Sequence, residues 1–173
     1  MSIAMYDASV ATYLQTLGGA ANVLAKGREH AEAGHMDLAE VVRYRLRDDM
    51  APFSFQVISV WHHSMGFVNA MKSGLFEPPP KMSGMDYDKL EALVAEATQV
   101  LQAESREDID ALADKPMTFR IGGRDLPFTT TNFLFTFSLP NFFFHAATLY
   151  DILRIHGVPL GKMDFIGQMR MGH

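Results

Sequence analysis

The sequence predicts an all-α protein, an up-down four-helix bundle with a small β-hairpin before its last long helix. Four long segments, separated by stretches rich in glycine and proline, carry apolar residues at the three-to-four spacing of helices that bury one face. Two short alternating stretches meet at Gly122 and Gly123, which is typical of a hairpin turn. With 173 residues and 48% hydrophobic content, the chain is predicted to form one domain over residues 1–173.

The first half of the chain is predicted to hold two long helices and one short one. The first long helix covers about residues 7–33, where the apolar side chains share one face. A short helix follows at Asp37, whose carboxylate can accept the first amide hydrogens. The second long helix is expected to begin at Asp48 or Asp49, either of which can cap it, and to reach Lys72.

The second half adds two more long helices. Asp86 is predicted to start the third, and Ser105 to cap one further short turn. The hairpin is expected at about residues 117–129. The fourth long helix is predicted over roughly residues 130–156, with a kink at Pro140 because proline cannot donate a backbone hydrogen bond.

A polar stripe on the fourth helix is the first candidate site. Ser138, Asn141, His145 and Thr148 are spaced three, four and three, so they share one helix face. Six of the thirteen phenylalanines lie within residues 133–144 and are expected to form core around the stripe. If the stripe faces the bundle interior, it is a candidate ligand site between helices. The alternative is a satisfied polar layer that fixes the helix register, with His145 hydrogen-bonded to a neighbour.

The second helix offers a partner for this stripe in the sequence WHHS. Trp61 would line the site, and either His62 or His63 would point into it. Adjacent residues on a helix diverge by about 100°, so only one of the two histidines can face a given point. The sequence leaves the choice open, with a slight preference for His62.

Composition excludes several classes of function. The chain contains no cysteine, which removes disulfides, thiolate metal sites and a cysteine nucleophile. A net charge of -5 without a long Lys/Arg cluster argues against partners such as nucleic acids or anionic membranes. The uncharged stretch 126–150 is long enough to span a bilayer, but its many polar residues predict a buried bundle helix instead. The N-terminus lacks the features of a signal peptide, so a soluble cytoplasmic protein is expected.

Several motifs resemble one known group of proteins. MYDASVATYLQTL, DDMAPFSFQV, WHHS, SLPNFFFHAATLYDILR and GKMDFIG resemble an uncharacterised bacterial domain-of-unknown-function family. That family is part of the DinB-like (YfiT-like) superfamily of four-helix-bundle proteins, and the resemblance covers nearly the whole chain. Members of the superfamily typically hold a divalent metal, often nickel or zinc, through three histidines. The resemblance places those ligands at His62 or His63, at Asn141 and at His145.

Asparagine in place of one histidine leaves two functions open. A neutral oxygen donor is poorly matched to zinc or nickel, so the site is expected either to bind metal weakly or to be a metal-free polar pocket. The favoured function is a small-molecule-binding or structural protein with a degenerate metal site. The alternative is a metal-dependent hydrolase or thiol transferase. The resemblance also implies a homodimer, and the apolar residues Trp61, Phe67 and Val68 are expected to supply its interface.

Overall fold

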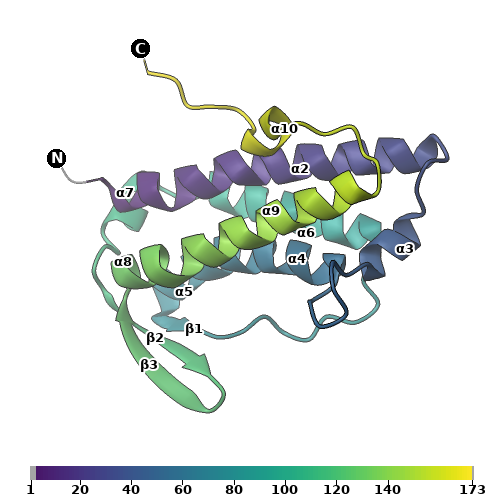
Figure 1. Ribbon diagram of the computed structural model, residues 1–173. Helices are drawn as coiled ribbons and strands as arrows, with labels where there is room; N and C mark the ends of the chain where they lie inside the picture. The colour runs from purple at the N-terminus through teal and green to yellow at the C-terminus, as the bar shows by residue number, and fades with distance from the viewer. Residues whose placement is uncertain (1–2, 173) are drawn as a thin grey trace.

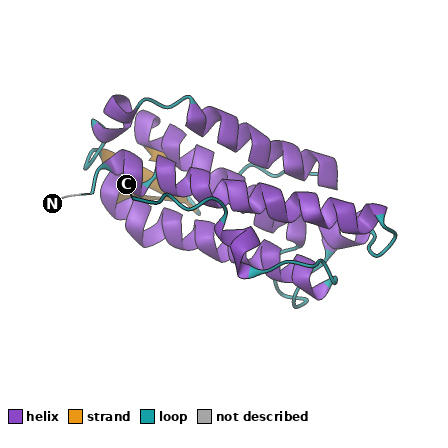
Figure 2. Ribbon diagram, turned by 90° about the horizontal axis from the view of Figure 1, so that it is seen from above, coloured by secondary structure: helices purple, strands orange, loops and turns teal. Residues whose placement is uncertain are grey.

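The computed structural model describes residues 3–172, most of which are helical (Figure 1). Four long helical segments lie side by side, as the view from above also shows (Figure 2). These segments are α2 (Val10–Glu32), α4–η1–α5 (Phe53–Trp61, His62–Gly66, Phe67–Ser73), α6 (Tyr87–Gln102) and α8–η2–α9 (Thr130–Phe133, Leu134–Ser138, Leu139–Ile155). The short helices are α1 (Met5–Ala8), α3 (Leu38–Arg43), α7 (Arg106–Asp110) and α10 (Lys162–Ile166).

Side-chain caps define several of these helices. Asp37 accepts a hydrogen bond from the amide of Ala39, which confirms it as the cap of α3, and Asp86 and Ser105 cap α6 and α7 in the same way. The predicted start of the second long helix at Asp48 or Asp49 is wrong.

That helix begins at Phe53, with Pro52 in the N-cap position. The amide of Phe53 donates to the carbonyl of Tyr44 at 2.8 Å, so the intervening residues close a loop instead of a helical turn. Proline suits this boundary because it has no amide hydrogen to satisfy.

The helix directions differ from the alternating up-down order that the sequence predicted. The rings of Phe53 and Tyr87, at the starts of α4 and α6, stack with centroids 6.0 Å apart. Lys72, near the end of α5, bonds Glu104 just after α6 at 2.6 Å. The second and third long segments therefore run in the same direction.

A crossover makes this parallel arrangement possible. Residues 77–86, which include three consecutive prolines, carry the chain back along the bundle to the start of α6 (Figure 1). An extended chain advances roughly 3.3 Å per residue and a helix about 1.5 Å, so this segment is long enough to span α6. We call residues 77–86 the crossover segment.

The predicted β-hairpin is confirmed and belongs to a slightly larger sheet. Strands β2 (Pro116–Ile121) and β3 (Arg124–Thr129) pair antiparallel around Gly122 and Gly123, whose φ angles are 58° and 75°. A strand that the sequence did not predict, β1 (Leu75–Phe76), pairs parallel with β2, which gives the order β1-β2-β3. Phe76 and Phe119 of this sheet pack against the ring of Phe133 in α8.

The core lies between the long helices and includes residues that were expected at a subunit interface. Phe67 and Val68 are 0% exposed within a single chain, so they cannot form an intermolecular surface. Trp61 is partly buried, and its indole nitrogen donates to Glu96 of α6 at 3.0 Å. The interface predicted from these three residues is therefore wrong. Across residues 3–172, no helix has the length and apolarity needed to cross a membrane.

Candidate functional site

Both helices that carry the candidate residues contain a π-helical turn. One is η1 (His62–Gly66) and the other is η2 (Leu134–Ser138). The second ends at Ser138, two residues before Pro140, which occupies the first turn of α9, where its missing amide hydrogen is tolerated. In a π turn each amide bonds to the carbonyl five residues back, which changes the direction of the side chains that follow. Such turns are frequent at functional sites.

A buried hydroxyl joins the two π-helical turns. Ser138 donates to the carbonyl of His63 at 2.8 Å, and the hydroxyl of Tyr13 lies 2.8 Å from the Ser138 oxygen. Ser138 has only one hydrogen to donate, so Tyr13 is the donor in the second bond. Both side chains are fully buried. Ser138, predicted to bind a ligand, thus holds three helical segments together and fixes the position of His63.

Two imidazole rings face each other between η1 and α9. The centroids of the His63 and His145 rings lie 6.2 Å apart, and the ring planes differ by 12°. Nδ1 of His145 lies 2.7 Å from the side-chain oxygen of Gln56, and the Gln56 amide nitrogen donates to the carbonyl of Ala51. Because that oxygen can only accept, the hydrogen sits on Nδ1 of His145, and Nε2 keeps a free lone pair.

His62 has a different role. Its Nε2 lies 2.7 Å from the carbonyl of Glu77, and its ring packs 4.6 Å from that of Phe76. On its own helix, a Cβ at position 66 would come within 2.9 Å of Nδ1 of His62, so Gly66 makes room for the ring. His62 anchors the crossover segment. The slight preference for His62 as the site residue is therefore corrected to His63.

Burial keeps these histidines neutral at neutral pH. Desolvation, followed by the nearby charges of His62 and His145, lowers the pKa of His63 to about 3. Desolvation lowers the pKa of His145 to about 4 and also lowers that of His62.

One buried nitrogen of the pair has no protein partner. Nδ1 of His63 is buried and makes no hydrogen bond, and the residue is only 7% exposed. An unpaired buried group of this kind costs about 1–3 kcal/mol. The site therefore contains one buried nitrogen without a partner, on His63, and one free lone pair, on Nε2 of His145.

The remaining predicted residues make local bonds. The Asn141 amide donates to the carbonyl of Phe137 at 2.8 Å, and Thr148 donates to the carbonyl of Phe144 at 2.7 Å. Trp61 is turned towards α6, as described above. From the predicted set, the structure thus brings His63 and His145 together, with Ser138 behind His63.

Sequence reasoning did not identify Gln56 as a site residue. A signal was present, because Gln56 lies seven residues before His63, and residues at that spacing share one helix face. Gln56 is 1% exposed, and a buried amide needs polar partners, which His145 and Ala51 supply.

The donor set does not fit the three-histidine metal centre implied by the resemblance. The pair supplies two imidazoles, and the Asn141 amide is turned back to its own helix. Within residues 3–172, no group of three His, Cys, Asp or Glu side chains could hold a metal ion. Zinc sites in proteins nearly always use at least three protein ligands. No chemical step through a metal follows from this arrangement.

The fold of the chain is similar to that of a solved protein. It is similar to the crystal structure of a DinB family member protein from Shewanella denitrificans, with a TM-score of 0.79 and 24% sequence identity over 97% of this chain and 94% of that chain. At this identity the likeness shows the fold alone. Residues 5–166 match the family described as "Domain of unknown function (DUF1993)", and the chain belongs to that family. No curated protein gives a significant match.

Proposed function

We propose that this protein binds a small uncharged molecule at the His63–His145 pair, without a three-ligand metal centre. The observation that carries the proposal is the pair of neutral imidazoles with unused nitrogens. Gln56 fixes the hydrogen of His145 on Nδ1, so Nε2 can accept a hydrogen bond from an O–H or N–H group. The buried Nδ1 of His63 is a second nitrogen of the pair without a protein partner.

The surroundings favour a ligand with an apolar or aromatic body. The Phe55 and Phe144 rings meet the His145 ring edge-on, with centroids 5.8 and 5.2 Å away. Phe137 packs 5.5 Å from His63. Apolar walls strengthen a hydrogen bond, because water does not compete for it. His145 itself is only partly buried, so its ring can be reached from outside. A phenol or a related aromatic alcohol has this combination of groups.

We also propose a domain organisation and a cellular location for the protein. Residues 1–173 form one domain, a four-helix bundle in which the crossover segment replaces the alternating order. The absence of cysteine in the sequence agrees with a cytoplasmic location.

The test is a titration with 4-methylphenol and, as a matched molecule without a hydrogen-bond donor, toluene. Nitrogen NMR of the histidine rings is recorded with a chelator present. We expect 4-methylphenol to shift Nε2 of His145 and to bind more tightly than toluene. H145F should weaken its binding by roughly three- to tenfold, the worth of one neutral hydrogen bond.

The control is H35F, at an exposed histidine outside the site. Equal binding of the two molecules, or unchanged binding in H145F, would contradict the proposal. Stoichiometric zinc or nickel binding that requires both His63 and His145 would favour the metal-dependent alternative instead.

A further inference from the structure

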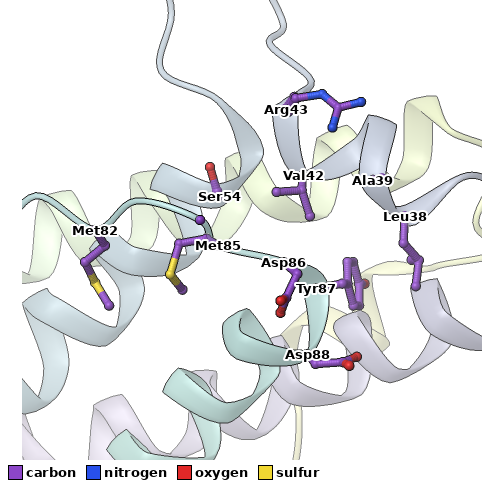
Figure 3. Close-up of a pocket in the computed structure, with 11 residues that line it drawn as sticks. Leu38, Ala39, Val42, Arg43, Ser54, Met82, Met85, Asp86, Tyr87 and Asp88 are labelled. Carbon is purple, nitrogen blue, oxygen red and sulfur yellow. The ribbon is translucent and has the colours of Figure 1, made fainter.

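A separate cavity lies where α3, the start of α4 and the start of α6 meet (Figure 3). Its volume is about 620 Å³, which is within the usual range for small-molecule sites. None of the histidines lines it. Its apolar wall consists of Leu38, Val42, Met82, Met85 and Tyr87.

A second cavity, of about 300 Å³, adjoins the first under the crossover segment. Ser54 and Met82 line both cavities. The second is otherwise mostly apolar, with Phe55, Ile58 and three prolines in its wall and Lys81 as its one charged residue. The two cavities are neighbours that share part of their wall, and methionine side chains such as Met82 can adapt to ligands of different shape.

The charges around the first cavity leave one cation uncompensated. Asp86 caps α6 and pairs with Lys89 at 3.0 Å, and Asp88 pairs with Arg28 at 2.5 Å. Among residues 3–172, Arg43 makes no ion pair. Figure 3 shows Arg43 at the rim with its guanidinium turned outward, while Val42 and Leu38 extend towards the cavity. A long arginine side chain at a rim can turn towards a bound group without disturbing the core.

We propose that this cavity binds an amphipathic organic anion, a carboxylate with a slender apolar body. The body would lie against Val42 and the two methionines and continue past Ser54 into the second cavity. The carboxylate would remain at the rim, where the planar guanidinium of Arg43 can bind both of its oxygens. No histidine lines either cavity, and Phe55, which lines the second cavity, is the residue that this site shares with the surroundings of His145.

The first test compares three probes with the same alkyl chain: decanoate, 1-decanol and decyltrimethylammonium. Calorimetry on the full-length protein should give saturable one-to-one binding of decanoate, weaker binding of decanol and the weakest binding of the cation. R43Q should weaken decanoate binding about three- to fivefold, as expected for an exposed ion pair, and leave decanol binding unchanged. R47Q, which changes an exposed arginine outside the cavity, is the matched control.

The second test fills the cavity. Ala39 lies on its wall and is exposed, so A39F places a ring in the space without touching the core. This variant should lose decanoate binding, while A25F, at an exposed position of α2, should bind like the wild type. If A39F still binds decanoate, the ligand does not bind in this cavity. Equal affinity for decanoate and decanol, or no effect of R43Q, would contradict the proposal that the ligand is an anion. If none of the three probes binds, the proposal that this cavity is a ligand site is wrong.

Discussion

His62 and His63 are neighbours in the sequence but serve different parts of the molecule. Their side chains diverge by about 100° on the helix, so one reaches the crossover segment at Glu77 and the other faces His145. Ser138 fixes the backbone of His63, because its hydroxyl donates to the His63 carbonyl and holds η1 against η2. A ligand at the histidine pair would therefore meet rings whose positions are set by hydrogen bonds outside the binding surface.

The depressed pKa values of His63 and His145 predict a specific loss of stability in acid. In the unfolded chain both rings titrate near pH 6.5, whereas in the folded protein the pKa values are about 3 and about 4. Between these limits the unfolded state binds more protons. This part of the stability is therefore complete above about pH 6.5 and is lost as the pH falls towards 4.

Each excess proton lowers the unfolding free energy by about 1.4 kcal/mol per pH unit in that window. Urea titrations of the wild type and of H63Q between pH 7 and pH 4 measure the slope. We expect a shallower slope in H63Q. An identical slope would mean that His63 is not held neutral by burial.

At the scale of elements, local chemistry explains what the sequence predicted well. The caps at Asp37, Asp86 and Ser105 depend on a side chain and an amide two or three residues away, so they are visible in a short window of sequence. The hairpin likewise follows from its glycine pair. The π turns and strand β1 depend on distant partners, such as the pairing of residues 75–76 with β2, and no local pattern specifies them.

Helix α10 is an element whose attachment can be tested. It packs on α2 so closely that a Cβ at Gly19 would lie 2.0 Å from the carbonyl oxygen of Phe165. Asp164 reinforces the contact through Lys26 at 2.7 Å. G19A should push α10 away and cost about 1–3 kcal/mol, as overpacking usually does. Hydrogen exchange of residues 161–168 should rise, and the midpoint of urea unfolding should fall.

The adjacent glycine provides the control for this prediction. Gly18 is exposed, and a Cβ there meets no atom within 4 Å. G18A should therefore stabilise the helix by up to about 1 kcal/mol, because alanine has less freedom in the unfolded chain. Unchanged exchange at α10 in G19A would contradict the close packing described here.

For the whole molecule, helix rotation and direction were the least predictable quantities. The sequence predicts a polar stripe on one face of the fourth helix, and His145 does lie between helices. Asn141 and Thr148, however, bond to their own helix, because a buried amide or hydroxyl can be satisfied by a carbonyl four residues earlier. The parallel direction of α4–η1–α5 and α6 depends on the path of the crossover segment, which composition alone does not reveal.

The exposed aromatic residues predict how the whole molecule associates. Phe135, Phe143 and Phe144 are 52%, 39% and 57% exposed along η2 and α9, although the sequence suggested that they belong to the core. A group of exposed large apolar side chains is typical of an interaction surface. We expect a homodimer with two-fold symmetry in which this surface meets its own copy, since the same patch then serves both chains.

Light scattering at micromolar concentration should give twice the monomer mass for the wild type and the monomer mass for F143D/F144D. Ile155, which is 59% exposed near the other end of α9, provides the matched control, and I155D should remain dimeric. A monomeric wild type would refute the dimer. If F143D/F144D is still dimeric, the interface lies elsewhere on the molecule. The reason is that two carboxylates that face their symmetry copies cannot be desolvated without a large cost.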